Sequence, residues 1–252
     1  LVSTTTIAVI IFVAAYALII TEKVHRTIVG IVGAMLMILF GVLDQETAIR
    51  HIDFNTLGLL MGMMIIVNIT SETGLFNFLA IWSAKKVKAR PISLLVALSA
   101  LTMVCSAFLD NVTTVLLMVP VTFAITTKLH IPVVPFLLTQ ILASNVGGTA
   151  TLIGDPPNIM IGSAVKELTF VAFIENLTPV VILCMAAVLF VMDVLYRKQM
   201  VTKPELQAEI MQMDEKKSLK DRKLLARSLF VLGLTILGFF THSFTHIESS
   251  VV

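Results

Sequence analysis

The sequence has 252 residues, of which 57% are hydrophobic and only 13% are charged, and its mean hydropathy is +0.97. Ordinary soluble domains carry roughly 25% charged residues, so this composition excludes a soluble globular protein and makes lipid the solvent for much of the surface. The net charge of +2 indicates no particular partner.

Long stretches without any charged residue recur along the chain. Each approaches or exceeds the roughly 17–25 apolar residues that a membrane-spanning helix needs. We therefore predict an all-α polytopic membrane protein. The uncharged stretches are 3–20, 27–43, 54–71, 131–154 and 176–192, and between 91 and 127 the only charged residue is Asp110.

The short loops predict the orientation of the first helices. Segments 21–26 (TEKVHR) and 85–90 (KKVKAR) are rich in Lys and Arg. Such loops stay in the cytoplasm. Segment 44–53 and the N-terminus are then expected on the outer side of the membrane. We expect that membrane to be a bacterial inner membrane. Because the chain starts at Leu1 and stops in a polar turn, we expect it to be a piece of a longer protein.

The stretch 91–127 is divided into two arms by Asp110 and Asn111. Two full spans joined by an exposed turn, or a re-entrant hairpin with a buried tip, would both return the chain to the same side. Thr113 and Thr114 add hydroxyls beside the pair, and Ser106 lies one turn earlier. An ordinary outer loop usually carries more polar residues, so the pattern favours a re-entrant helical hairpin.

The stretch "ASNVGGTATLIGDPPN" (143–158) predicts a broken helix within about 133–164. Glycine tolerates dihedral angles that a helix forbids, so we expect the backbone to unwind from Asn145 to Gly148. Asp155 precedes Pro156, which suits the first turn of a new half-helix. Non-helical backbone at membrane depth is tolerated only where it lines a cavity or is buried in protein. The pattern therefore predicts an ion site.

The C-terminal part begins with a charged segment, 197–227, that holds nine of the eighteen Lys and Arg residues and is expected to be a cytoplasmic linker. Acidic residues are interspersed there and no aromatic platform accompanies them, so nucleic acid is not an expected partner. A last helix is expected within 228–252. Asn68 matches the N-glycosylation pattern but lies in an apolar stretch, so glycosylation is not expected.

The motifs "SAFLDNVTTVLLMVPVT" (106–122) and "NVGGTATLIGDPPNIMI" (145–161) together resemble the ion transporter superfamily. Within it, the sequence is most similar to the P protein, the arsenite pump membrane subunit and the sodium–proton antiporters; citrate and dicarboxylate carriers are more distant. The resemblance implies a fold of two inverted repeats. Residues 1–196 would form the first repeat, and 228–252 would begin a second, truncated one.

The resemblance also implies an ion and substrate site between the hairpin tip and the broken helix. In the carboxylate carriers the tip carries Ser-Asn-Thr, whereas Asp110 stands here in place of the serine. This difference suggests a titratable or cation-binding site. A sodium site is implied at Asp110, Asn111 and Gly148. The full set of expected binding residues is Asp110, Asn111, Thr113, Thr114, Asn145, Gly147, Gly148, Thr149, Thr151, Asp155 and Asn158.

We therefore expect a secondary active transporter of a small ion or small anion, coupled to sodium or protons, and no enzyme or cofactor. Arsenite efflux, sodium–proton exchange and anion movement all remain open, as antiport or symport. Expected partners are the bilayer, the second repeat and the transported ion, with a homodimer as a candidate assembly. A passive anion channel is an alternative. An intramembrane aspartyl protease is disfavoured, because Leu152 replaces the required glycine in "LIGD" (152–155).

Overall fold

The computed structural model describes residues 3–165 and 167–245, with side chains up to residue 241. Within these ranges every regular element is helical. The chain divides into two compact units, residues 1–54 and 55–252, which are described separately. The end of the range 228–252, predicted to hold the last helix, lies outside the described residues.

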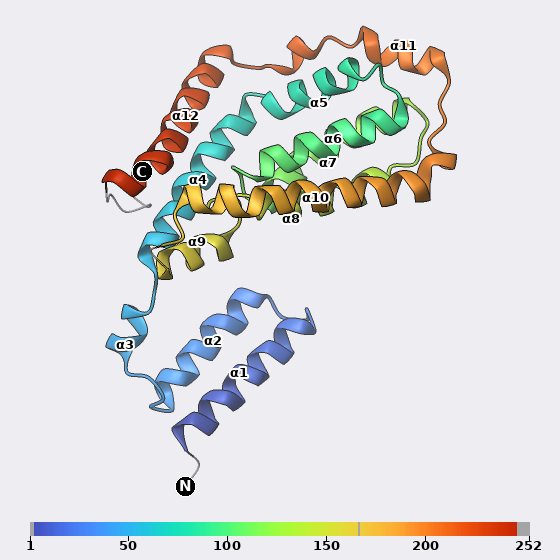
Figure 1. Cartoon of the computed structure of the whole chain (residues 1–252). Coiled ribbons are helices and arrows are strands. Elements are labelled where there is room, and N and C mark those ends of the chain that lie inside the picture. The colour runs from blue at the N-terminus through green and yellow to red at the C-terminus, as the bar shows by residue number, and fades with distance from the viewer. Residues whose placement is uncertain (1–2, 166, 246–252) are drawn as a thin grey trace. The chain divides into compact units, whose positions relative to one another are not determined.

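The first unit is a pair of apolar helices followed by a short one. Helices α1 (Thr4–Ile20) and α2 (Arg26–Leu39) pack side by side (Figure 1). α3 (Gln45–Arg50) follows and is capped by Asp44. Val29 is the one buried residue of α1 and α2, so most of their apolar side chains face outward. Such a surface suits lipid, where apolar groups need no cover.

The second unit holds the remaining helices. Two of its breaks coincide with the polar motifs of the sequence: one between α6 and α7, the other between α8 and α9. The bounds are α4 (Phe54–Glu72), α5 (Leu75–Lys86), α6 (Pro91–Ser106), α7 (Asn111–Lys128), α8 (Val134–Gly148), α9 (Pro156–Ala164), α10 (Phe170–Tyr196), α11 (Pro204–Gln212) and α12 (Arg222–Thr245), with short 3-10 turns at Arg197–Gln199 and Glu215–Ser218.

Four helices of the described chain are long and apolar enough to cross a membrane. Shorter apolar helices accompany them, namely α1, α2, α6 and α8. These lengths confirm the prediction of an all-α polytopic membrane protein. The four candidate spans are Phe54–Glu72, Asn111–Lys128, Phe170–Gln199 and Arg222–Thr241.

Two buried clusters hold the second unit together. The larger one packs α5, α6 and α7 around side chains such as Leu94, Leu98 and Ile125, with Phe136 of α8 against them. The other joins α4 and α9 to the start of α10 and to α12, where the rings of Phe170 and Phe239 lie 5.7 Å apart. The hairpin arms are thus fixed on one side by α5 and on the other by α8.

The segment 197–227, predicted to be a charged linker, packs along the ends of α5 and α7. Ile210 of α11 is completely buried in the larger cluster. The hydroxyl of Thr202 donates to the carbonyl of Leu129 at 2.6 Å, just after α7. The N–H of Lys220 donates to the carbonyl of Thr73 at 3.0 Å, just before α5. This segment is therefore an ordered strap as well as a connector.

One ion pair fixes the middle of this strap. The Lys85 ammonium lies 2.6 Å from a carboxylate oxygen of Glu215 and donates to the Met213 carbonyl at 3.1 Å. The hydrogen bond from Lys85 lowers the pKa of Glu215 from its ordinary value. Since both side chains are partly exposed, we expect the pair to fix the path of the strap more than to stabilise the fold.

Candidate functional site

The hairpin turns over four residues, 107–110, and Asp110 ends the turn by capping α7. Its Oδ2 accepts hydrogen bonds from the N–H and from the hydroxyl of Thr113, both at 2.9 Å. A carboxylate at this position satisfies an N–H group that has no partner inside the helix. Asn111, Thr113 and Thr114 therefore lie in the first turn of α7 and not in a free loop.

The break in the second motif begins later than the sequence predicts. Helix α8 continues through Gly148, and the non-helical segment is 149–155. The prediction that the backbone unwinds from Asn145 is wrong because the glycines serve packing. A Cβ atom on Gly147 would overlap the backbone of Met103 in α6. Without a side chain at 147, α6 and α8 approach backbone to backbone, and Gly148 lies against the backbone of Gly154.

Three hydrogen bonds join the hairpin to the break. The Asn111 amide donates to Oδ1 of Asn145 at 3.1 Å, linking α7 to the last turn of α8. The buried Ser106 hydroxyl donates to the Ser144 carbonyl at 2.7 Å. The Thr151 hydroxyl donates to a carbonyl in the hairpin turn, that of Ala107. The two polar motifs, about 35 residues apart in sequence, thus form one structure.

Asn158 closes the break from the other side. Its amide donates to the carbonyl of Gly148 at 3.1 Å and to that of Thr151 at 3.0 Å. The first bond satisfies a carbonyl that the end of α8 leaves without a helical partner, and the second fixes the loop. Gly154 lies between the segments, where a Cβ atom would overlap backbone of both Gly148 and Ser106. The loop 149–155 is therefore held at both ends.

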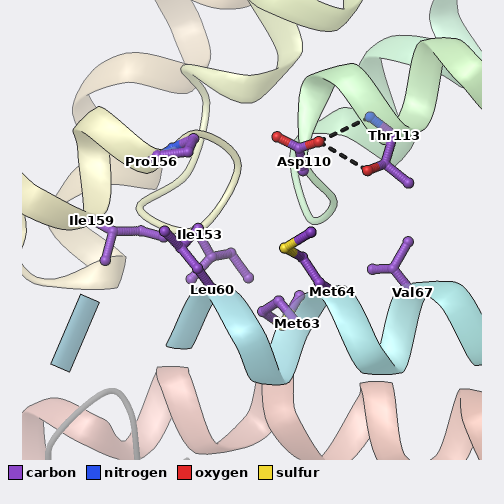
Figure 2. Close-up of a pocket in the computed structure, with 9 residues that line it drawn as sticks. All are labelled: Leu60, Met63, Met64, Val67, Asp110, Thr113, Ile153, Pro156 and Ile159. Carbon is purple, nitrogen blue, oxygen red and sulfur yellow. Dashed lines mark hydrogen bonds between the residues drawn. The ribbon is translucent and has the colours of Figure 1, made fainter. Parts of the chain in front are cut away.

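A small cavity lies where these elements face α4. Its volume is about 20 Å³, which is room for about one water molecule. Figure 2 shows Asp110 and Thr113 on one side of it and α4 on the other. The remaining wall is apolar. The lining residues are Leu60, Met63, Met64, Val67, Asp110, Thr113, Ile153, Pro156 and Ile159.

Asp110 is the acidic residue that lines this cavity. Both of its hydrogen bonds are made by Oδ2, and no basic side chain among the described residues pairs with it. Asp155 precedes Pro156, another lining residue, and occupies the N-cap position of α9 without a capping hydrogen bond from its side chain. Two carboxylates thus lie near one small space.

Two threonines of the predicted set behave differently. The Thr114 hydroxyl is fully buried and has no hydrogen-bond partner among the described residues. The Thr149 hydroxyl donates back to the Val146 carbonyl of α8 at 2.7 Å, and the residue lines a separate hollow against α10. The structure therefore brings Thr113 to the Asp110 cavity but directs Thr149 elsewhere. Within the described ranges, no group of three or more His, Cys, Asp or Glu side chains is placed to hold a metal ion.

Sequence reasoning missed a second hollow beside the first. It measures about 340 Å³ and lies between α4 and α7. It shares Met64 and Thr113 with the small cavity and adds Asn68 and Ser71 of α4. The spacing of 64, 68 and 71 places these residues on one helical face. That spacing is visible in the sequence, but the sequence alone connects Asn68 only with the N-glycosylation pattern.

Comparison with known proteins agrees with this architecture. An uncharacterized transporter of Mycobacterium bovis is 40% identical over 250 residues, which are 98% of this chain and 58% of that protein. The 46 kDa membrane protein of Mycobacterium leprae is 38% identical with the same coverage. The human P protein is 42% identical over 163 residues, which are 63% of this chain and 20% of that protein.

The chain spans a little over half the length of its mycobacterial relatives. Residues 16–252 match the family described as Citrate transporter, so the match includes the hairpin, the broken helix and the strap. The chain therefore belongs to the citrate transporter family of membrane transporters, within the ion transporter superfamily that its two motifs indicated.

Proposed function

We propose that this chain is part of a secondary active transporter that moves a small ion or small anion and is coupled to sodium or protons. One observation carries the proposal. The Asp110 carboxylate lines a cavity of about 20 Å³, and no basic side chain of the described residues neutralises it. The hairpin and the broken helix, which both contribute residues to that cavity, are hydrogen-bonded to each other.

The cost of such a carboxylate supports a role for it. An aspartate near the centre of a bilayer costs about 2.5–3.5 kcal/mol on insertion scales. Capping α7 alone would not require a charge, because serine, threonine and asparagine also cap helices. A carboxylate that carries a sodium ion or a proton across the membrane explains why the charge is present.

The neighbouring groups suit a small cation. Hard cations prefer oxygen ligands. Asp110 supplies carboxylate oxygens, and the Thr113 hydroxyl lies 2.9 Å from one of them. Asn111 and the carbonyl of Gly148 belong to the same hydrogen-bonded structure. The alternative is a proton on Asp110, for which the same carboxylate is the carrier and Asp155 is a second candidate.

Transport by the full-length protein in proteoliposomes tests this proposal. Arsenite, citrate, a dicarboxylate and a halide are offered with an imposed sodium or proton gradient. We expect uphill uptake of at least one solute that collapses when the gradient is removed. A passive channel would show only downhill flux. Replacement of Asp110 by Asn should abolish the ion dependence.

Asp44→Asn is the matched control, because Asp44 also caps a helix through a threonine three residues later. We expect this variant to transport like the native protein. If Asp110→Asn transports as well as the native protein and keeps the same ion dependence, the coupling role of Asp110 is wrong.

A further inference from the structure

The hollow between α4 and α7 lies directly beside the ion cavity. The two spaces share Met64 and Thr113, but the hollow is far larger, about 340 Å³ against about 20 Å³. Thr113 and Leu117 contribute its wall on α7. From the Asp110 end of α7, the hollow extends along the helix toward Lys128. It therefore lies beside the hairpin arm and not beyond the tip.

The polar part of this hollow comes from Asn68 and Ser71 of α4. Asn68 is exposed and Ser71 is half-buried, and neither side chain has a hydrogen-bond partner within the described part of the protein, whereas the neighbouring Thr70 hydroxyl donates to the Ile66 carbonyl at 2.7 Å. Because α4 is long and apolar enough to cross a membrane, an exposed amide that faced lipid there without a partner would be costly. Water or a polar solute in the hollow removes that cost.

Among the described residues, no charged side chain lines the hollow, whose lining is Met64, Ile65, Asn68, Ser71, Thr113 and Leu117. An amide offers both donors and an acceptor, and each hydroxyl offers one donor and two acceptor positions. Such a wall recognises a solute by hydrogen bonds to its oxygens. The negative charge of the ion cavity, in contrast, comes from Asp110.

We propose that Asn68 and Ser71 form the solute compartment of this transporter, adjoining a separate ion compartment at Asp110. The solute is a small molecule or oxyanion that carries hydroxyl or carboxyl oxygens. This inference rests on the proposed transport function and assigns the solute contacts within this half of the protein.

Thr113 connects the two compartments. Its hydroxyl donates to Asp110 at 2.9 Å, and its side chain lines both spaces. A cation bound at the other carboxylate oxygen, Oδ1, draws negative charge away from Oδ2 and weakens the hydrogen bond from the Thr113 hydroxyl. The Thr113 hydroxyl is then free to turn toward the solute, so that occupation of one compartment changes the affinity of the other. Thr113 is thus a positioning residue for both ligands.

The test measures the kinetics of citrate, dicarboxylate and arsenite uptake by the full-length protein in proteoliposomes, and the solute is whichever of these the native protein transports. Asn68→Leu and Ser71→Ala remove the polar groups with little change in volume. We expect the KM for the solute to rise roughly 5- to 20-fold, as for loss of a hydrogen bond of ordinary strength. The ion concentration that gives half-maximal uptake should stay within about twofold of the native value. Asn77→Leu is the matched control, because Asn77 is an exposed asparagine of α5 that lines neither space.

Thr113→Val and Thr113→Ser test the connection. Valine keeps the shape and removes the hydroxyl, so the KM for the solute should become independent of the coupling ion. Serine should restore the dependence. If the valine variant keeps the native dependence, the connection through Thr113 is wrong.

The two proposals fail in different ways. Native protein whose transport shows no ion dependence contradicts the coupled-transport proposal, whatever the KM of the Asn68→Leu variant. Native protein that is coupled, with an unchanged KM for every solute in both Asn68→Leu and Ser71→Ala, overturns the solute compartment.

Cysteine labelling covers the case in which Asn68→Leu does not fold. In a background lacking Cys105 and Cys184, Asn68→Cys should react with a membrane-impermeant thiol reagent, and saturating solute should slow the reaction. Absence of labelling from both sides of the membrane, or labelling that no transported solute slows, contradicts the proposal.

Discussion

Two aspartates cap helices with the same local pattern but in different surroundings. Asp44 caps α3 in the first unit, and Asp110 caps α7 in the second. At α3 the two bonds from Thr47 go to different carboxylate oxygens, at 2.9 and 2.5 Å. At α7 both bonds from Thr113 go to Oδ2. The comparison shows that a capping aspartate can keep one oxygen without a protein partner.

The surroundings explain why only one of these aspartates is a candidate ion ligand. Asp44 is exposed, whereas Asp110 is partly buried beside the cavity under α4. In the second unit glycine also lets α6 and α8 approach closely, as Gly147 does against Met103. In the first unit a Cβ atom on Gly30 would meet nothing within 4 Å. Close backbone packing therefore distinguishes the two regions more than capping chemistry does.

The largest expected effect on stability comes from filling the glycine contact. Gly147→Ala forces a methyl group into the backbone of Met103, which should cost about 1–3 kcal/mol or more, as overpacking does. Gly30→Ala should instead raise stability by about 0.5–1 kcal/mol, because alanine favours the helix. Thermal unfolding of the purified full-length variants measures both. Equal changes in stability in the two variants would contradict the difference in backbone packing between the two regions.

A buried hydrogen-bonded pair gives the next effect. The Gln140 amide donates to the Thr122 hydroxyl at 2.8 Å, and both residues are completely buried between α7 and α8. Gln140→Leu should cost about 1–3 kcal/mol, because it removes a buried bond and disturbs a polar site. Adding Thr122→Val should recover part of the loss, since both partners are then apolar. A strictly additive double variant in the same unfolding assay would contradict this coupling.

The cap of α3 should give a smaller effect that depends on pH. The hydrogen bonds from the Thr47 hydroxyl and N–H lower the pKa of Asp44 from its ordinary 3.8. A carboxylate whose pKa is lower in the folded state stabilises above the unfolded value and loses that contribution as the pH falls through the folded value. Asp44→Ala should therefore lower the melting temperature slightly at about pH 7 and less at about pH 3. A lowering of the melting temperature that is larger at about pH 3 than at about pH 7 would contradict this expected pH dependence.

The smallest effect is expected in the strap. Lys85 lowers the pKa of Glu215 from its ordinary 4.5, so the pair stabilises at neutral pH and is lost on acidification below that value. Glu215→Gln should lower the melting temperature slightly at low ionic strength, and salt should reduce the difference because it screens exposed charges. A difference that persists in high salt would indicate that the carboxylate acts through something other than this ion pair.

The sequence predicts the hairpin and the break because polar residues are rare in its apolar stretches. Asp110 and Asn111 are the polar pair at which the chain turns, and Pro156 starts the half-helix α9. The exact end of α8 could not be predicted. A pair of glycines indicates either an unwound backbone or a close approach, and only the position of α6 distinguishes these.

The tertiary partners of two further segments were also beyond sequence reasoning. Asn68 and Ser71 lie near the end of an apolar helix, and their significance depends on the position of α7 beside them. Ile210 lies in a charged segment, and nothing local shows that it is buried against α5 and α7. In both cases the role of the residue depends on contacts with residues that are distant in sequence.

The most direct test of the account joins the two polar motifs covalently. Asn111→Cys and Asn145→Cys are introduced together in full-length protein that lacks Cys105 and Cys184, and the protein is oxidised in its native membrane. The account predicts that the pair forms a disulfide and that the cross-linked protein does not transport, whereas an Asn77→Cys and Asn145→Cys pair does not react. Failure of the first pair to cross-link, or full ion-coupled transport by the cross-linked protein, would contradict the claim that the hairpin tip and the break of α8 together form the transport site.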